Sequence, residues 1–277
     1  LNERIYAVKS VHFLKSFTFL YLILIFSLVA GCRNSEPSDQ IRVGTIDGPE
    51  TELMETAQKV ALAKYGLKVK IIPFTDYSLP NQALNDGSID INMFQTFPFL
   101  RADVKAHGYN FKVVGLSFLY PMAIYSKKIK SIGLVPLNAT VAIPNDPSNE
   151  ARALLLLQKA GLIHLKKNAN ALATIQDIVE NPKKLQIKEL DAAQIPRTLQ
   201  DVTLAVANTN YAVPAGLYPT KDGLFLEDKN SPYMNIFVVK AGFENDPRVQ
   251  KLLQSFHSRA VLNKANELFK GQAIPGW

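Results

Sequence analysis

Apolar stretches of two kinds alternate along the first part of the chain. The β-branched run at 41–46 predicts a buried strand, and residues 51–66 place apolar side chains on one face of a helix that ends at Gly66. The same two patterns predict further strands and helices, at 67–74, 88–94 and 112–118 for the strands and at 79–87 and 99–107 for the helices. Alternating strands and helices are typical of an α/β fold with a largely parallel sheet.

The alternation resumes in the second half of the chain. Strands are expected at 139–143, 185–190, 202–206 and 234–239, and helices at 149–160, 209–215, about 246–257 and 259–269. A chain of 277 residues is long enough for one large domain or two lobes of ordinary size. Because no internal repeat or low-complexity tract is seen, the pattern predicts two α/β units rather than a solenoid.

The first 31 residues have the pattern of an export signal. Three basic residues precede an uncharged run at 17–30, which is shorter than the roughly 18–20 apolar residues that span a bilayer. A basic segment followed by a short apolar core is typical of a secretory signal peptide. We therefore expect residues 1–31 to be a signal peptide that takes no part in the fold.

The only cysteine follows this run directly. Val29-Ala30-Gly31-Cys32 resembles the bacterial lipobox, in which the chain is cleaved before the cysteine and the sulfur carries a diacylglycerol. We expect Cys32 to be lipidated, 32–39 to form a polar tether, and the rest of the chain to lie outside the cytoplasm, which is the periplasm if the cell is Gram-negative. The alternative is an ordinary N-terminal anchor with an incidental cysteine.

Charge and cysteine usage exclude several classes of protein. The formal net charge is +7, but Lys and Arg are spread along the chain with Asp and Glu between them. That distribution predicts a mixed, solvated surface rather than a nucleic-acid-binding one. A single cysteine excludes an internal disulfide framework and a cysteine-based zinc cage.

Signatures of catalysis are missing from the sequence. There is no phosphate-binding loop, no dinucleotide fingerprint and no HExxH zinc motif, and we expect neither cofactor nor metal. His107, His164 and His257 lie far apart and beside basic residues, which favours surface positions. We expect a protein that is not an enzyme. A hydrolase remains the alternative, and it would need a nucleophile and base facing a cleft.

Arg152 is in an unusual position for a cation. A helix is expected to begin after Pro147, with Ser148 or Asn149 as its N-cap, so that Arg152 falls in the first turn. The helix dipole disfavours positive charge at that end. A negative group should compensate, and it can be Glu150, a distant carboxylate or a bound anion.

Two further groups of residues fit either a ligand pocket or the core. Phe94, Phe97 and Phe99 crowd the end of a predicted strand, with Tyr77 upstream, and aromatic side chains there suit an apolar ligand group or plain core packing. Asn208 and Asn235 are amides flanked by apolar strand residues. Their side chains can bond a ligand or only nearby backbone.

Long stretches of the chain resemble the methionine-binding lipoproteins of bacterial ABC importers, the MetQ/NlpA family. They include KYGLKVKIIPFTDYSLPNQAL, SIDINMFQTFPFL, VAIPNDPSNEARALLLLQKAGLI, KDGLFLEDKNSPYMN and GQAIPGW, and together they cover nearly all of the mature chain. The resemblance implies a two-lobed periplasmic-binding-protein type II fold with a central ligand cleft and a hinge. It would divide the chain into one lobe at 40–121 plus 231–277 and another at 122–230.

The resemblance also implies a ligand site. Arg152 would hold the carboxylate of an amino acid with Asn149 beside it, and Asn208 and Asn235 would bond its other backbone atoms. The side-chain pocket would be lined by Tyr77, Phe94, Thr96 and Phe99. Family members commonly read F-Q-H-x-P-Y where this chain has Phe94-Gln95-Thr96-Phe97-Pro98-Phe99, so two polar aromatic groups are replaced. Backbone recognition can survive that change while side-chain preference shifts.

The function that the resemblance implies is delivery of an amino acid, with methionine expected, to an ABC permease in the membrane. Two alternatives stay open at this point. The ligand can be another amino acid or a methionyl dipeptide, or the chain can be an envelope interaction or adhesion lipoprotein with a vestigial cleft.

Overall fold

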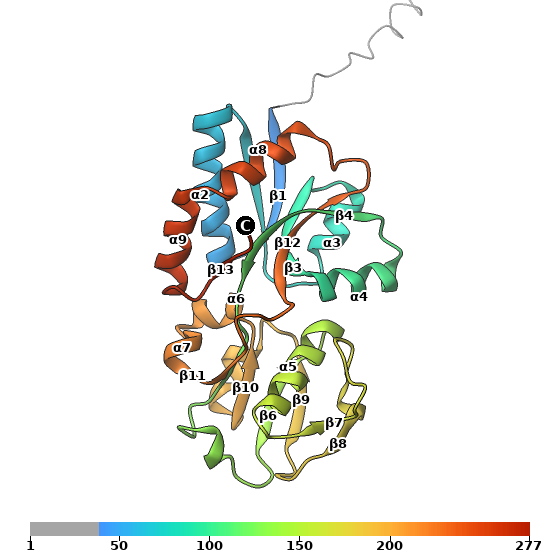
Figure 1. Ribbon diagram of the computed structural model, residues 1–277, viewed down its shortest axis with the longest axis vertical. Coiled ribbons are helices and arrows are strands. Elements are labelled where there is room, and N and C mark those ends of the chain that lie inside the picture. The colour runs from blue at the N-terminus through green and yellow to red at the C-terminus, as the bar shows by residue number, and fades with distance from the viewer. Residues whose placement is uncertain (1–38) are drawn as a thin grey trace, which may run out of the picture. The chain divides into compact units, whose positions relative to one another are not determined.

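A computed structural model describes residues 39–277, which form two lobes, each built on its own β-sheet (Figure 1). The expected signal peptide at 1–31 and the expected lipid site at Cys32 lie outside the described residues. None of the helices in the described part of the chain is long and apolar enough to cross a bilayer.

The first lobe has a six-stranded sheet in the order β13-β4-β12-β3-β1-β2. The strands are β1 (Gln40–Ile46), β2 (Lys68–Phe74), β3 (Ile91–Thr96), β4 (Phe111–Leu119), β12 (Met234–Lys240) and β13 (Ile274–Pro275). β1 pairs in parallel with β2 and β3, as predicted. β12 is antiparallel to both β3 and β4, because the chain re-enters the lobe from the other direction and inserts a strand between them.

Helices cover both faces of this sheet. They are α2 (Pro49–Tyr65), α3 (Pro80–Asp86), α4 (Phe97–His107), α8 (Pro247–Phe256) and α9 (Arg259–Phe269). α2, α8 and α9 pack together on one side, while α3 and α4 contact β3 and β12 (Figure 1). The main core joins apolar residues of α2, such as Leu53, to Phe237 of β12 and Phe256 of α8, all fully buried. Burial of this face fixes where the carboxyl ends of the strands emerge.

The second lobe has a five-stranded sheet in the order β11-β5-β10-β6-β9. Its strands are β5 (Ala123–Tyr125), β6 (Thr140–Pro144), β9 (Gln186–Leu190), β10 (Leu204–Ala207) and β11 (Gly223–Leu226). The main helix is α5 (Pro147–Lys159), and its apolar side packs against β6. Smaller elements complete the lobe. They are the paired strands β7 (His164–Leu165) and β8 (Ile178–Glu180) and the short helices α6 (Thr209–Ala212) and α7 (Pro219–Asp222). The lobe also has four 3₁₀ segments, η1 (Ile132–Leu134), η2 (Ile175–Asp177), η3 (Ile195–Gln200) and η4 (Val213–Ala215).

The chain passes between the lobes twice. It leaves the first lobe between β4 and β5, and it returns between β11 and β12. The two crossings are bonded to each other, since the amide of Glu227 donates to the carbonyl of Met122 at 2.9 Å. Two adjacent crossings of this kind form the hinge on which a two-lobed binding protein turns.

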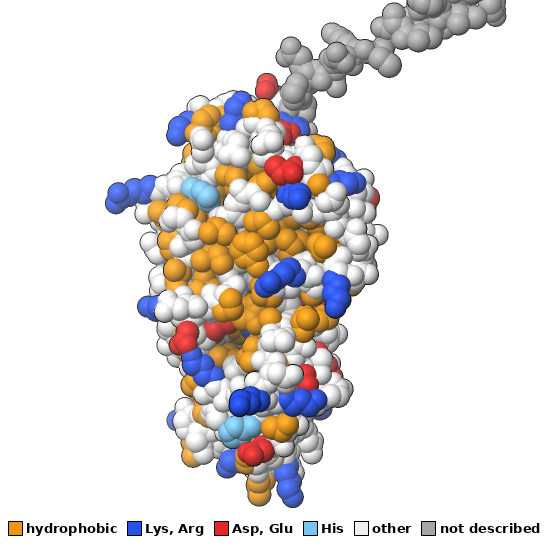
Figure 2. Space-filling view, turned by 45° about the vertical axis from the view of Figure 1, so that its right-hand side comes forward, with side chains coloured by type: hydrophobic (Ala, Val, Ile, Leu, Met, Phe, Trp, Pro, Cys, Tyr) orange, Lys and Arg blue, Asp and Glu red, His pale blue; other side chains and the backbone are white. Residues whose placement is uncertain are grey.

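Charged side chains show no gathering on the face in Figure 2. Lys and Arg are scattered over it with Asp and Glu among them, and hydrophobic side chains gather across its middle. This distribution matches the mixed surface that the sequence predicts.

Candidate functional site

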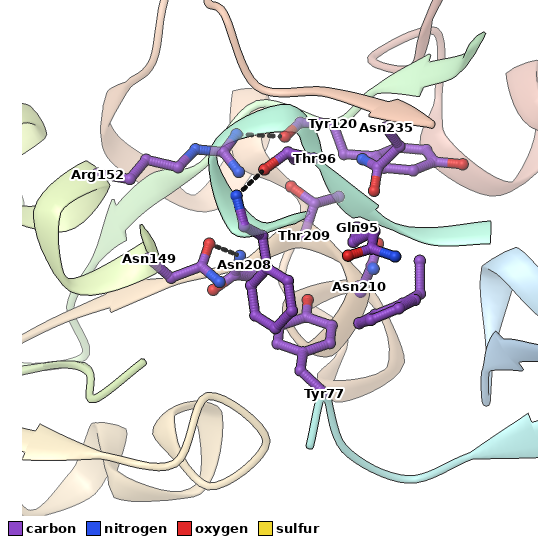
Figure 3. A pocket seen from close by; sticks show the side chains of 12 residues that line it. Tyr77, Gln95, Thr96, Tyr120, Asn149, Arg152, Asn208, Thr209, Asn210 and Asn235 are labelled. Atoms are coloured by element: carbon purple, nitrogen blue, oxygen red, sulfur yellow. Dashed lines mark hydrogen bonds between the residues drawn. The ribbon is translucent and has the colours of Figure 1, made fainter. Parts of the chain in front are cut away.

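A buried pocket lies between the lobes (Figure 3). Twelve residues line it, and they are Tyr77, Phe94, Gln95, Thr96, Phe99, Tyr120, Asn149, Arg152, Asn208, Thr209, Asn210 and Asn235. They come from the end of β3, from the segments that follow β2, β3, β6 and β10, from the start of β12 and from the first crossing. Carboxyl ends of strands in α/β sheets are a common place for ligand sites.

All eight residues that the resemblance assigns to a ligand line this pocket. The register of the first sheet explains part of the arrangement, because Asn235 of β12 pairs with Thr96 at the end of β3. Asn149 and Asn208 each follow a strand of the second sheet. Phe97, which the sequence groups with Phe94 and Phe99, is 38% exposed and does not line the pocket.

The guanidinium of Arg152 is held by three partners. Nε donates to Oε1 of Glu227 at 2.9 Å, and Nη2 donates to Oε2 of Glu227 and to the carbonyl of Tyr120, the latter at 3.0 Å. The ring of Tyr233 stacks against the group, with its centroid 4.4 Å from Cζ. Nη1 makes no hydrogen bond to residues 39–277 and belongs to a side chain that lines the pocket. Its donors are therefore available to an anion.

Glu227 thus supplies the negative charge that Arg152 needs. Of the compensating groups considered from the sequence, the distant carboxylate is present, 75 residues along the chain. Burial by itself lowers the pKa of Arg152, but the attraction of Glu227 outweighs it and the pKa is raised overall. The arginine therefore stays charged inside the protein.

The start of α5 differs from the prediction. The N-cap is Asp146, whose carboxylate accepts from the backbone amide of Asn149 at 2.9 Å, so the expected cap at Ser148 or Asn149 is wrong. Asp is an equally good capping residue, and Pro147 then occupies the first helical position that suits it. Arg152 consequently lies in the second turn of the helix. Burial raises the pKa of Asp146, and its hydrogen bonds from Asn149 oppose that shift.

A chain of amides runs from this cap into the pocket. Asn149 donates its side-chain amide to both oxygens of Asp146, at 3.1 and 2.9 Å, and accepts from the amide of Asn208 at 2.8 Å. Oδ1 of Asn208 is nevertheless buried without a hydrogen-bond partner among residues 39–277. Oδ1 of Asn210 is also buried and has no hydrogen-bond partner among these residues. Buried polar atoms are nearly always satisfied in proteins, so these two acceptors can receive hydrogen bonds from a ligand or from water.

Aromatic rings form the opposite wall. The ring centroids of Tyr77, Phe94 and Phe99 lie 5.5 to 6.0 Å apart, in tilted and edge-to-face pairs. Thr96 caps α4 by accepting from the amide of Phe99. Burial raises the pKa of Tyr77, which keeps its hydroxyl neutral. This wall suits an apolar ligand group, with edges that also attract a sulfur atom.

Several residues at the site were not predicted from the sequence. They are Gln95, Tyr120, Thr209 and Asn210 in the lining, and Glu227 and Tyr233 behind Arg152. Asn210 had a visible signal, since it follows Asn208 in the same short polar segment. Gln95 gave no signal because most of its neighbours in the sequence are apolar. Its side-chain amide forms hydrogen bonds with the side chains of Asn81 and Asn92, which lie behind the pocket. Glu227 had no local signal, because its partner is far away in sequence.

Comparison with known proteins agrees with this geometry. The family model described as NlpA lipoprotein matches residues 41–277. The chain belongs to the NlpA lipoprotein family. It has the two-lobed substrate-binding fold of that family's solved members, and this confirms the predicted fold class.

Individual relatives of this NlpA lipoprotein are similar over most of their length. The D-methionine-binding lipoprotein MetQ of Salmonella typhi is 50% identical over 252 residues, which are 90% of this chain and 93% of that protein. The ABC transporter periplasmic substrate-binding protein of Coxiella burnetii is 55% identical, with a TM-score of 0.83 over 85% of this chain and all of that one (100%). A nutrient-binding protein of Burkholderia cenocepacia, solved with bound methionine, is 49% identical, with a TM-score of 0.84 over 86% of this chain and 100% of that one.

Proposed function

We propose that this NlpA lipoprotein is the solute-binding component of an ABC importer and that its ligand is an amino acid, methionine. The observation that carries the proposal is the pairing of free donors and free acceptors in one buried pocket. Nη1 of Arg152 is open to an anion, and Oδ1 of Asn208 and Oδ1 of Asn210 are open to a cation. An α-amino acid carries one group of each kind, both attached to its α-carbon.

The three parts of methionine match three parts of the pocket. Its carboxylate accepts from Arg152, a charge-assisted contact, with Asn149 beside it. Its ammonium donates to the amide oxygens, with Asn235 completing that side. Its thioether chain packs against the wall of Tyr77, Phe94 and Phe99, where sulfur–aromatic contacts add about 0.3–1.5 kcal/mol. The same wall admits other apolar side chains, so a binding experiment is needed to rank methionine against other amino acids.

The lobes close around the ligand. Tyr77 of the first lobe already meets Tyr211 of the second with ring centroids 5.0 Å apart, and the hydroxyl of Thr209 donates to the carbonyl of Pro121 in the first crossing. A ligand that contacts both lobes binds the closed form better than the open form and shifts the population toward it. The closed form is then the species that docks on the permease.

The role in transport fixes the location that we propose. The signal peptide at 1–31 exports the chain, and lipid on Cys32 holds the two lobes at the membrane surface beside the permease. A binding and delivery role of this kind requires no reaction on the ligand. In the described part of the chain, no three His, Cys, Asp or Glu side chains cluster as a metal site would require.

Calorimetry with methionine tests the proposal. Arg152→Ala is expected to weaken binding by about 30- to 5,000-fold, since loss of a buried charge-assisted contact costs about 2–5 kcal/mol. The matched control is Arg101→Ala, which removes an exposed arginine outside the pocket and should leave binding unchanged. Equal affinity for the Arg152 variant and the wild type would overturn the assignment.

A thermal-shift panel identifies the ligand. A ligand present at 100 times its dissociation constant adds about 2.7 kcal/mol of stability, so methionine, other amino acids and methionyl dipeptides can be ranked directly. Methionine is expected to give the largest shift. The absence of a shift with every compound would favour an adhesion or interaction lipoprotein whose cleft is vestigial.

A further inference from the structure

Glu227 lies where three segments of the chain meet. Its two oxygens bond Nε and Nη2 of Arg152 on α5, and Oε2 also accepts from the amide of Met122 in the first crossing at 3.1 Å. Its own backbone belongs to the second crossing and is bonded to Met122. One carboxylate therefore ties the pocket arginine to both halves of the hinge.

This contact fixes the direction of the arginine. Nε and Nη2 are fully used by Glu227 and Tyr120, and Tyr233 holds the plane of the group from one side. Only Nη1 remains for a ligand. A carboxylate that accepts two hydrogen bonds from the Nε–Nη2 edge of a guanidinium prevents rotation of the guanidinium plane.

The same contact changes the charge that the ligand meets. The side chains of Arg152 and Glu227 are 5% and 11% exposed, so the pair is a buried, neutral unit rather than a free cation. A ligand with a carboxylate alone would add an uncompensated negative charge to this interior. A zwitterion adds no net charge to it.

We propose that Glu227 is a positioning and specificity residue that aims Nη1 of Arg152 at the ligand and makes the pocket select a zwitterionic amino acid over a bare carboxylate. This inference rests on the proposed function, because it concerns the ligand that Arg152 holds. Glu227 acts through Arg152.

The experiment compares two ligands that differ by one charged group. Methionine is the zwitterion, and 4-(methylthio)butanoate is the same molecule without its amino group. Dissociation constants for both are measured by calorimetry with the wild type, Glu227→Gln and Glu227→Asp. Asp228→Asn is the matched control, since Asp228 is the adjacent acid, with a side chain that is 66% exposed and pairs with Lys159 away from the pocket.

The ratio of the two dissociation constants is the decisive readout. The wild type is expected to favour methionine, and Glu227→Gln is expected to reduce that preference by about tenfold or more, because the buried negative charge that opposes a bare anion beside Arg152 is removed. Glu227→Asp keeps the charge and should keep the preference while binding both ligands less tightly. Asp228→Asn should behave as the wild type.

A purely structural role gives a different pattern. It would weaken both ligands by the same factor in Glu227→Gln and leave the ratio unchanged, and that result would overturn the inference. If Glu227→Gln does not fold, the Glu227→Asp protein decides, and loss of the preference for methionine in that variant would overturn the inference. Equal affinity of the wild type for the two ligands would overturn the inference as well. Failure of the proposed function looks different again, since the wild type would then bind neither methionine nor any other amino acid.

Discussion

The ring of Tyr77 in the first lobe and the ring of Tyr211 in the second lie 5.0 Å apart, centroid to centroid, at an angle of 51°. Tyr77 also contacts both phenylalanines of the pocket wall. Tyr77 therefore belongs both to the contact between the lobes and to the aromatic wall of the pocket, so we expect ligand binding at that wall to be linked to closure of the cleft.

This pair gives a first prediction. Aromatic pairs contribute about 0.5–1.5 kcal/mol beyond burial, so Tyr211→Ala should weaken methionine binding by about two- to tenfold. Tyr211→Phe should stay within about twofold of the wild type, because the tyrosine hydroxyl has no hydrogen-bond partner among residues 39–277. Calorimetry on both variants checks this, and equal losses in the two would show that the hydroxyl rather than the ring matters.

A second prediction concerns Glu50, at the start of α2. Both of its carboxylate oxygens are buried without hydrogen bonds to the described residues. Burial raises its pKa from 4.5 to about 8, and nearby Asn210 and the backbone of Ile46 offset only part of that shift. The side chains of Tyr77, Tyr120 and Tyr211 also lie within its electrostatic reach.

The sign of the pH dependence follows from linkage. Between about pH 4.5 and 8 the folded protein keeps a proton that the unfolded chain releases, so the free energy of unfolding should fall by about 1.4 kcal/mol per pH unit as pH rises. Glu50→Gln removes this contribution, and its melting temperature should decline less between pH 5 and 8. Glu52→Gln is the control, a partly exposed acid in the same helical turn that pairs with Lys264 at the surface. Parallel curves for the wild type and Glu50→Gln would contradict the prediction.

The cap of α5 supports a third prediction. Asp146→Ala should lower the free energy of unfolding by about 1–2 kcal/mol and also weaken ligand binding, because Asn149 loses the partner that orients it toward Asn208. Asp246 caps α8, far from the pocket, so Asp246→Ala should cost stability without changing affinity. Urea unfolding and calorimetry on the two variants separate the effects. A loss of affinity in both would mean that destabilisation alone explains it.

The sequence predicts the longer elements well and the short ones poorly. The strand at β1 and the helices α2 and α5 carry clear apolar periodicity, and the structure has them within a few residues of the predicted bounds. β5 and β11 were missed because runs of three and four residues carry too little periodicity to be recognised. Antiparallel insertion of β12 was missed because strand order depends on how the chain returns between lobes.

The pocket residues came from the family resemblance, and local chemistry by itself left their roles open. Arg152 was an exception, since its place near a helix start called for a negative partner. That partner, Glu227, could not be found from the sequence, because the two residues meet only once both crossings are formed. The cap was misplaced because Asp146, Ser148 and Asn149 are all good capping residues and the sequence does not distinguish among them.

The site of Arg152 beside both crossings has a kinetic consequence. Points close to a rotation axis move little when two bodies turn about it. Because Arg152 is bonded to both crossings, we expect the proposed carboxylate subsite to stay assembled whether the cleft is open or shut. The contact of Tyr77 with Tyr211 joins the two lobes, and we expect it to separate when they open. Amino acids of different side chains should therefore associate at similar rates and differ mainly in residence time, a division that stopped-flow fluorescence can measure. We therefore expect the part of the pocket beside the crossings to bind the carboxylate that all amino acids share, and the aromatic wall to distinguish their side chains.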